Sequence, residues 1–242
     1  MELMKQEDTA FFKESLSKLG IEISDLQLEQ FLSFYELLIE KNKVMNLTAI
    51  TDFREVISKH FVDSLALARV YSLKDESVID IGTGAGFPGI PLKIIYPDIN
   101  LTLFDSLKKR LNFLDELIEK LNLKKITTLH GRAEDFGRDE RYREGFDLCV
   151  SRAVAKLPVL LELCIPFIKK DGYFISYKSG NVDEEIEMSK NALKLLKAKI
   201  SKRDSFILPG TELQRSLLLV QKLENTPKTY PRNPAKIEKN PL

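Results

Sequence analysis

The segment Val78–Leu92, VIDIGTGAGFPGIPL, joins two apolar runs through a turn rich in glycine. An apolar run, a glycine-rich turn and a second apolar run are typical of a β-strand followed by an α-helix. Glycine suits such a turn because it tolerates positive φ angles and close backbone approach. The segment therefore predicts the first strand–loop–helix unit of an α/β fold, with a ligand held at the loop.

Strand-like and helix-like segments alternate after this unit. The expected strands cover residues 77–82, 100–106, 125–131, 146–153 and 172–179. The expected helices cover residues 89–97, 107–123, 157–169 and 182–198. Two further strand-like runs, 200–210 and 215–223, have no helix between them and predict a hairpin. The pattern favours a doubly wound, mostly parallel α/β sheet of Rossmann-like type that ends in an antiparallel strand.

The chain before this sheet has no convincing strand. Apolar residues at helical spacing occur in 9–20 and 25–43, with Ser24 or Asp25 as the N-cap of the second helix. A further helix is expected over 52–71, broken near His60. We therefore predict a helical N-terminal subdomain (1–72), a ligand-binding domain (73–225) and a basic, proline-rich C-terminal tail (226–242).

Composition is that of an ordinary globular protein, with 43% apolar residues, 30% charged residues and a net charge of +1. No apolar run approaches the ~20 residues that a bilayer span needs, and the N-terminus lacks the apolar core of a signal peptide. Cys149 and Cys164 lie in apolar contexts without metal-ligand spacing, so both are expected to be reduced core residues of a cytoplasmic protein. Nucleic-acid binding would require a local basic patch.

Two ligands fit the glycine-rich loop. GAGFPG, Gly84–Gly89, matches the dinucleotide pattern, and DIGTGAG, Asp80–Gly86, matches the loop that holds S-adenosylmethionine in many methyltransferases. A dinucleotide presses its pyrophosphate against free amides at a helix N-terminus, and the carboxylate of Asp80 would repel it. S-adenosylmethionine carries a sulfonium cation and no phosphate. The loop therefore favours S-adenosylmethionine, held by Asp80, Gly82, Gly84 and Gly86.

Acidic residues occur at the ends of the next two expected strands or just after them. Asp105 lies about 20 residues past the loop, where a ribose-binding acid is expected, and it could also cap the helix that begins near Leu107. Glu134, with the backbone of Ala133 and Glu134, could bound an adenine pocket. The alternative for Glu134 is a solvated glutamate in the first turn of a helix.

The acceptor of the methyl group is constrained by the segment after the fourth strand, SRAVAK (Ser151–Lys156). It contains neither the Asn/Asp-Pro-Pro-aromatic turn of amino methylation nor the Pro-Cys pair of carbon methylation, and no His/Asp cluster suggests a metal. An acceptor with a free lone pair, such as guanine N7, needs only positioning. Arg152 could fix the cofactor carboxylate or the acceptor, or could form a salt bridge to Asp80 or Glu134.

Seven segments together resemble one family: NLTAI, HFVDSL, DIGTGAGFPGIPL, FDSLKKRLNFL, GRAEDF, FDLCVSRAVAKL and YPRNPAKIEKNPL. In order and spacing they are similar to the bacterial 16S ribosomal RNA guanine-N7 methyltransferases, also called glucose-inhibited division protein B. The resemblance implies a Rossmann-like methyltransferase with a helical extension, acting on one guanosine of the 16S rRNA or the small ribosomal subunit. It implies Gly82 and Phe87 as cofactor-loop residues, Ala133 and Glu134 beside the adenine, and Arg152 as an essential arginine.

Candidate RNA contacts are basic residues expected around the pocket mouth. They are Arg54, His60, Arg110, Arg132, Lys178 and Arg232. We expect a monomer without metal or membrane partners. Three other functions remain open from the residues alone: a small-molecule methyltransferase, a nicotinamide or flavin oxidoreductase, and a non-catalytic RNA-binding or assembly factor.

Overall fold

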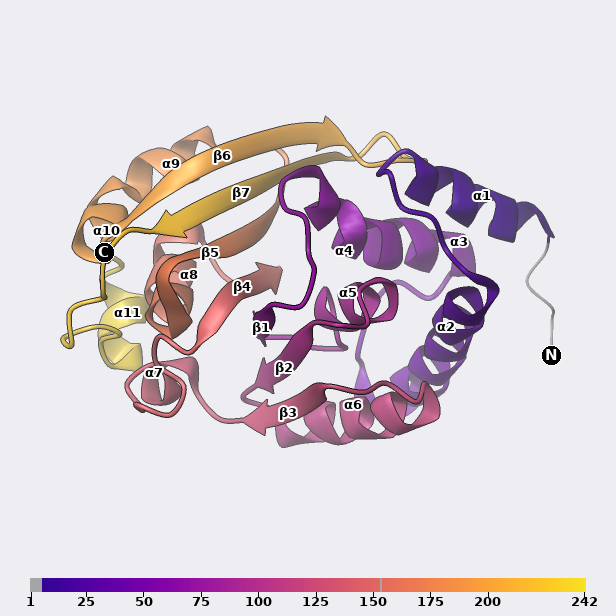
Figure 1. Ribbon diagram of the computed structural model, residues 1–242, viewed down its shortest axis with the longest axis horizontal. Coiled ribbons are helices and arrows are strands. Elements are labelled where there is room, and N and C mark those ends of the chain that lie inside the picture. Colours follow the sequence, from indigo (N-terminus) through magenta and orange to yellow (C-terminus); the bar gives the residue numbers. More distant parts are fainter. Residues whose placement is uncertain (1–5, 153) are drawn as a thin grey trace.

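The computed structural model describes residues 6–152 and 154–242 and contains a seven-stranded sheet (Figure 1). The strands are β1 (Ser77–Ile81), β2 (Asn100–Asp105), β3 (Ile126–His130), β4 (Phe146–Arg152), β5 (Ile168–Ser179), β6 (Ala198–Ile207) and β7 (Gln214–Lys222). Their order is β3-β2-β1-β4-β5-β7-β6. The first five pair in parallel, and β7 is antiparallel to both β5 and β6. The predicted mixed α/β sheet and its terminal hairpin are confirmed.

Helices precede, separate and follow these strands. The N-terminal segment contains α1 (Gln6–Ser17), α2 (Asp25–Met45), α3 (Phe53–Val56), η1 (Ile57–Val62), α4 (Asp63–Leu65) and η2 (Ala66–Arg69). The connections between strands contain α5 (Gly89–Ile95), α6 (Lys108–Lys120), α7 (Ala133–Phe136), α8 (Leu157–Cys164), η3 (Ile165–Phe167), α9 (Asp183–Met188) and α10 (Lys190–Leu195). One short helix in the C-terminal tail, α11 (Pro234–Lys239), was not expected from the sequence.

One helical prediction is confirmed and two differ in detail from the structure. Ser24, one of the two expected N-caps, is the N-cap of α2, and its side chain and that of Gln27 form a reciprocal capping box. The expected helix over 182–198 is divided at Ser189 into α9 and α10. The helix expected to break near His60 instead continues through η1, a π-helical turn that contains His60. Such turns often occur at functional sites because they widen the helix and redirect side chains.

Side chains of the sheet alternate between two apolar layers. Leu148 and Val150 of β4 pack on one face, with the N-terminal helices, α5 and α6. Cys149 packs on the other face, with α8, α9 and α10 (Figure 1). Both cysteines are buried and unpaired, as predicted. Among the described helices, none is long and apolar enough to cross a membrane.

The N-terminal helices share a core with the sheet. Phe12, Phe31, Phe34 and Phe61 are buried and in aromatic contact, and Phe87 from the glycine-rich loop joins them by stacking on Phe34 with ring centroids 5.0 Å apart. The helices therefore hold the loop directly. The predicted boundaries at residues 72 and 225 stay predictions.

Candidate functional site

The glycine-rich loop between β1 and α5 satisfies its own backbone. Gly82 and Thr83 donate to the carbonyl of Phe104, and Gly86 and Phe87 donate to that of Thr83. Gly84 donates to the carboxylate of Asp105 at 3.0 Å. Because these amides are already paired, the loop lacks the cradle of free N–H groups that binds a pyrophosphate. The geometry thus argues against the dinucleotide alternative.

Asp80 stabilises the loop through buried hydrogen bonds. Its side chain is fully buried, and Oδ2 accepts hydrogen bonds from the Thr83 hydroxyl (2.7 Å) and the Gly89 amide (2.9 Å). Burial raises the pKa of Asp80 to about 7. Gly86 has a similar supporting place, since a Cβ there would lie 2.7 Å from Ile90 Cγ1. Neither residue lines the adjacent cavity, and direct contact of either one with a ligand stays a prediction.

The glycine-loop cavity, about 630 Å³, lies at the carboxyl ends of β1 to β4. Its size is in the range of small-molecule sites. All the predicted cofactor residues except Asp80 and Gly86 line it, together with three of the candidate RNA contacts. These lining residues are Gly82, Gly84, Phe87, Asp105, Ala133, Glu134, Arg152, His60, Arg110 and Arg132.

Asp105 combines the two roles considered for it. Its carboxylate accepts from the Gly84 amide, from the Leu107 amide at 2.8 Å and from Arg110 Nη1 at 3.4 Å. It therefore caps the turn into α6 and also lines the cavity. A carboxylate offers about four acceptor positions, so one position is left for a ligand hydroxyl.

Charge in the glycine-loop cavity is balanced. Three arginines and three carboxylates line its wall: Arg110, Arg132, Arg152, Asp105, Glu134 and Glu238.

Ala133 and Glu134 begin α7, and the first amides of a helix have no intrahelical acceptor. The amides of Ala133 and Glu134 can therefore donate hydrogen bonds to acceptor atoms at the edge of a planar ring.

Arg152 ends β4 and is bound to the N-terminal helices. Its Nη1 donates to Asp63 Oδ2 at 2.9 Å and to the carbonyls of Lys59 and His60 at 3.3 Å. Its guanidinium carbon lies 5.1 Å from the ring centroid of Phe87. The salt bridge considered from the sequence is therefore made to Asp63, and not to Asp80 or Glu134. Asp63 also accepts from Arg215 Nε at 2.9 Å, so one buried carboxylate positions two arginines.

His60 completes this arrangement as a neutral side chain. Its Nε2 is 2.8 Å from the Thr48 hydroxyl, its Nδ1 is 3.4 Å from Arg152 Nη2, and its ring stacks on Phe87 at 4.5 Å. Burial, with the nearby Arg152 charge as the second cause, lowers the pKa of His60 from 6.5 to about 3. A neutral imidazole accepts from Arg152 through Nδ1 while Nε2–H donates to Thr48.

We expect the stability of the protein to reveal this low pKa. Because the unfolded chain protonates His60 near pH 6.5 and the folded protein only near pH 3, acidification between these values favours unfolding. His60 contributes a slope of at most about 1.4 kcal/mol per pH unit. Urea unfolding of the wild type and His60→Asn between pH 4 and 8 should give curves that converge toward low pH. Parallel curves would contradict the assignment.

The remaining candidate RNA contacts have different surroundings. Lys178 donates to the carbonyl of Ala155 at 2.9 Å and pairs with Glu185 at 2.7 Å. Arg54 is exposed and lies over the ring of Phe11, 4.3 Å from its centroid. Neither lines the glycine-loop cavity. Their contact with RNA stays a prediction.

Arg232 anchors the C-terminal tail. Its guanidinium forms a two-pronged pair with Glu162 of α8, at 2.7 and 2.9 Å, and Glu162 is fully buried. These bonds leave little of the guanidinium for a phosphate, which differs from its expected RNA role.

We expect Arg232→Met to destabilise the fold by about 3 kcal/mol, because it leaves a buried carboxylate without its partner. The double variant Arg232→Met/Glu162→Gln should recover much of that loss. Urea unfolding of both variants measures the effect. If Arg232→Met had unchanged stability and bound RNA more weakly and with less salt dependence, Arg232 would be an RNA contact and not a structural anchor.

Comparisons with known proteins show the family of this chain. The family model described as rRNA small subunit methyltransferase G matches residues 27–215. A protein named ribosomal RNA small subunit methyltransferase G from Lachnoclostridium phytofermentans is 52% identical over 236 residues, 97% of this chain and 98% of its own length. One of the same name from Acetivibrio thermocellus is 48% identical and covers 95% and 94%. The chain belongs to the rRNA small subunit methyltransferase G family.

Solved structures agree with the fold. A SAM-dependent methyltransferase from Aquifex aeolicus superposes with a TM-score of 0.54 at 15% identity, over 72% of this chain and 96% of that one. M. jannaschii TYW2 in complex with AdoMet gives a TM-score of 0.54 at 15% identity, over 72% and 80%. At this identity the likeness concerns the methyltransferase fold alone.

Sequence reasoning missed several residues of this family member's site. Thr48 and Asp63 lie in NLTAI and HFVDSL, two segments that carried the resemblance, so that signal was present without a role. Arg215 had no local signal, since it meets Asp63 only because β7 is inserted beside β5. Val154 packs on the loop: a Cβ at Gly82 would lie 2.6 Å from Val154 Cγ2.

Proposed function

We propose that this protein transfers the methyl group of S-adenosylmethionine to N7 of a guanosine in 16S ribosomal RNA. The observation that carries the proposal is the glycine-loop cavity, which has paired loop amides and balanced charge, in a chain of the rRNA small subunit methyltransferase G family. Balanced charge suits a ligand that combines a sulfonium, an amino group and a carboxylate.

The residues present fit this cofactor. A Cβ added at Gly84 would have only the Gly82 carbonyl oxygen near it, at 4.0 Å, so the loop leaves open space where a ligand can approach the backbone. The free acceptor position of Asp105 suits a ribose hydroxyl, and the first amides of α7 suit the adenine edge. Arg152 is placed to bind a carboxylate or to orient the acceptor base.

The chemistry needs positioning more than proton transfer. The cofactor supplies an electrophilic methyl group on a sulfonium sulfur. The N7 lone pair of guanine is free at neutral pH, so it forms the new N–C bond as the C–S bond breaks. The bonding electrons pass to sulfur, and the positive charge moves to the base. No proton is removed, which is consistent with a neutral, fixed His60 and a site that holds reactants in place.

The test is tritiated methyl transfer into small ribosomal subunits from a strain that lacks this protein. Reduction and aniline cleavage then map any 7-methylguanosine. Label at one guanosine is the expected result. Calorimetric binding of S-adenosylmethionine without label in RNA would redirect the function to a small-molecule acceptor, and failure of both would refute the proposal.

We further propose that the protein acts as a monomer in the cytoplasm, where ribosomal subunits are found. Two buried, unpaired cysteines are consistent with a reducing compartment. Light scattering of the purified protein tests the monomer, with a mass near 27.7 kDa as the expected result.

A further inference from the structure

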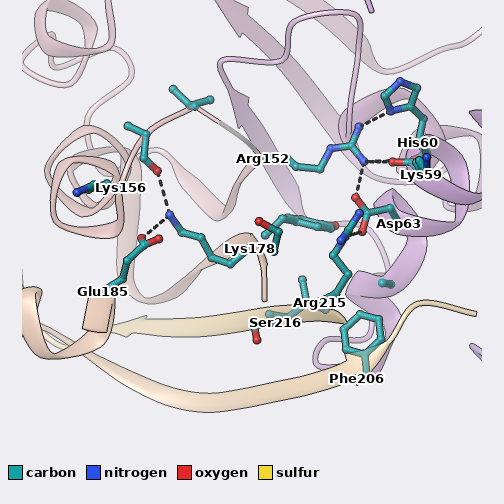
Figure 2. Close-up of a pocket in the computed structure, with 16 residues that line it drawn as sticks. Lys59, His60, Asp63, Arg152, Lys156, Lys178, Glu185, Phe206, Arg215 and Ser216 are labelled. Carbon is teal, nitrogen blue, oxygen red and sulfur yellow. Dashed lines mark hydrogen bonds and ion pairs between the residues drawn. The ribbon is translucent and has the colours of Figure 1, made fainter. Parts of the chain in front are cut away.

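A second cavity of about 490 Å³ lies on the other side of Arg152 (Figure 2). It shares His60, Arg152 and Val154 with the glycine-loop cavity. Val154, an apolar side chain that is 43% exposed, is among these shared residues and packs on the glycine-rich loop. The two spaces therefore meet at the end of β4.

The antiparallel pair β5–β7 builds the floor of this second cavity. β7 begins where β5 ends, and the register pairs Tyr177 with Leu217 and Ser179 with Arg215. The Tyr177 hydroxyl donates to the Ser64 carbonyl at 2.7 Å, which fixes the ring against α4. Phe206 of β6 adds an aromatic wall. Because β7 runs antiparallel to β5, the first residues of β7 lie at the edge of the sheet where the parallel strands end.

Charge distinguishes the second cavity from the glycine-loop cavity. Five cationic side chains and two carboxylates line it, whereas the glycine-loop cavity is balanced. The cations are Lys59, Arg152, Lys156, Lys178 and Arg215, and the carboxylates are Asp63 and Glu185. A concave site with excess positive charge and an aromatic wall fits a nucleotide, whose phosphates are anionic and whose base stacks.

The cations form two groups. Lys156 and Lys178 lie at one side of the cavity, and Arg152, Arg215 and Lys59 lie at the other, near Asp63 (Figure 2). A nucleotide within an RNA chain carries a phosphate on each side of its sugar, so two separated cationic groups match it better than they match a free nucleoside.

We propose that the second cavity receives the target guanosine, turned out of its RNA, with its two flanking phosphates at these cationic groups and its base against Phe206. This inference rests on the proposed function. A base inside a duplex cannot reach a buried methyl donor, so enzymes that modify bases take them out of the stack. Arg152, between the cavities, then marks the place where N7 meets the methyl group. Lys156 and Phe206 become substrate-binding residues outside the glycine-loop cavity.

The experiment compares Lys156→Gln and Phe206→Ala with the wild type on unmethylated small ribosomal subunits. Both side chains line the second cavity only, and Lys156 is exposed, so its variant should fold normally. We expect kcat/KM for the subunits to fall about tenfold or more in each, while the calorimetric Kd for S-adenosylmethionine stays unchanged. In Lys156→Gln, the slope of log affinity against log salt, from filter binding of the subunits, should decrease by about one.

The matched control is Lys124→Gln. Lys124 is exposed and lies two residues before the start of β3, at the opposite, amino edge of the sheet, so this substitution removes the same charge far from both cavities. If wild type methylates the subunits and both cavity variants behave like Lys124→Gln, the second cavity is not the acceptor site, although the proposed function stands. If wild type methylates no RNA, the proposed function fails and this inference fails with it.

Discussion

Arg152→Ala is expected to reduce methyl transfer at least about a hundredfold while leaving the protein folded. Arg152 lines both cavities, and its guanidinium is fixed by Asp63, two backbone carbonyls and the ring of Phe87. In a reaction that depends on positioning, displacement of the reactants by about 1 Å is sufficient for a hundredfold loss. Transfer into small ribosomal subunits under single-turnover conditions measures the effect directly.

The fold should tolerate this change because Asp63 keeps its second partner. Arg215 still donates to Asp63 Oδ1, so the carboxylate is not left buried and unpaired. We therefore expect a stability loss below the about 3–5 kcal/mol of a fully broken buried pair. Arg152→Lys should restore little activity, since an ammonium lacks the planar fork. Arg141→Ala, which removes an ion pair with Asp139 at the surface, is the matched control and should leave methyl transfer unchanged. Near-normal transfer by Arg152→Ala would refute the positioning role.

Gly84→Val is expected to abolish cofactor binding. Gly84 has a φ of 60°, and a side chain there would enter the open space of the glycine-loop cavity. The calorimetric Kd for S-adenosylmethionine should rise at least about a hundredfold, because the loop backbone can no longer be approached. A β-branched residue at positive φ also strains the backbone by about 1–3 kcal/mol.

Gly20→Val separates the two effects. Gly20 has a φ of 72° and nothing within 4 Å of its added Cβ, in the turn between α1 and α2. It should lose similar stability yet bind the cofactor normally. Equal affinity in both variants would mean that the ligand does not use the loop.

Much of the fold was predictable because its signals are local. The central parallel strands β1 and β4 are buried on both faces, so they appear in the sequence as short apolar runs. Ser24 and Asp25 indicated the beginning of α2 in the same local way, and Ser24 is its N-cap. The short helix α11 and the division at Ser189 depend on packing against α8, and no local pattern indicated them.

The predictability of the site residues follows the same distinction between local sequence signals and long-range packing. Residues at the carboxyl ends of strands, such as Asp105 and Arg152, were found because parallel strands bring these ends together. The hydrogen bonds that Asp80 accepts from Thr83 and Gly89 could not be predicted, because no spacing in the sequence reveals them. Asp63 and Arg215 are 152 residues apart in the chain, and only the sheet order brings them together.

The stack of Phe34, Phe87 and His60 has a consequence for the evolution of the molecule. One ring belongs to the methyl-donor loop and its two neighbours belong to the N-terminal helices, with centroids 5.0 and 4.5 Å away. The helices are therefore not an accessory module that could be exchanged between methyltransferases. A shortened chain that begins at residue 73 would expose Phe87, lose the anchor of Arg152 and leave both cavities without one wall. Recognition of RNA and presentation of the methyl group are thus inherited as a unit.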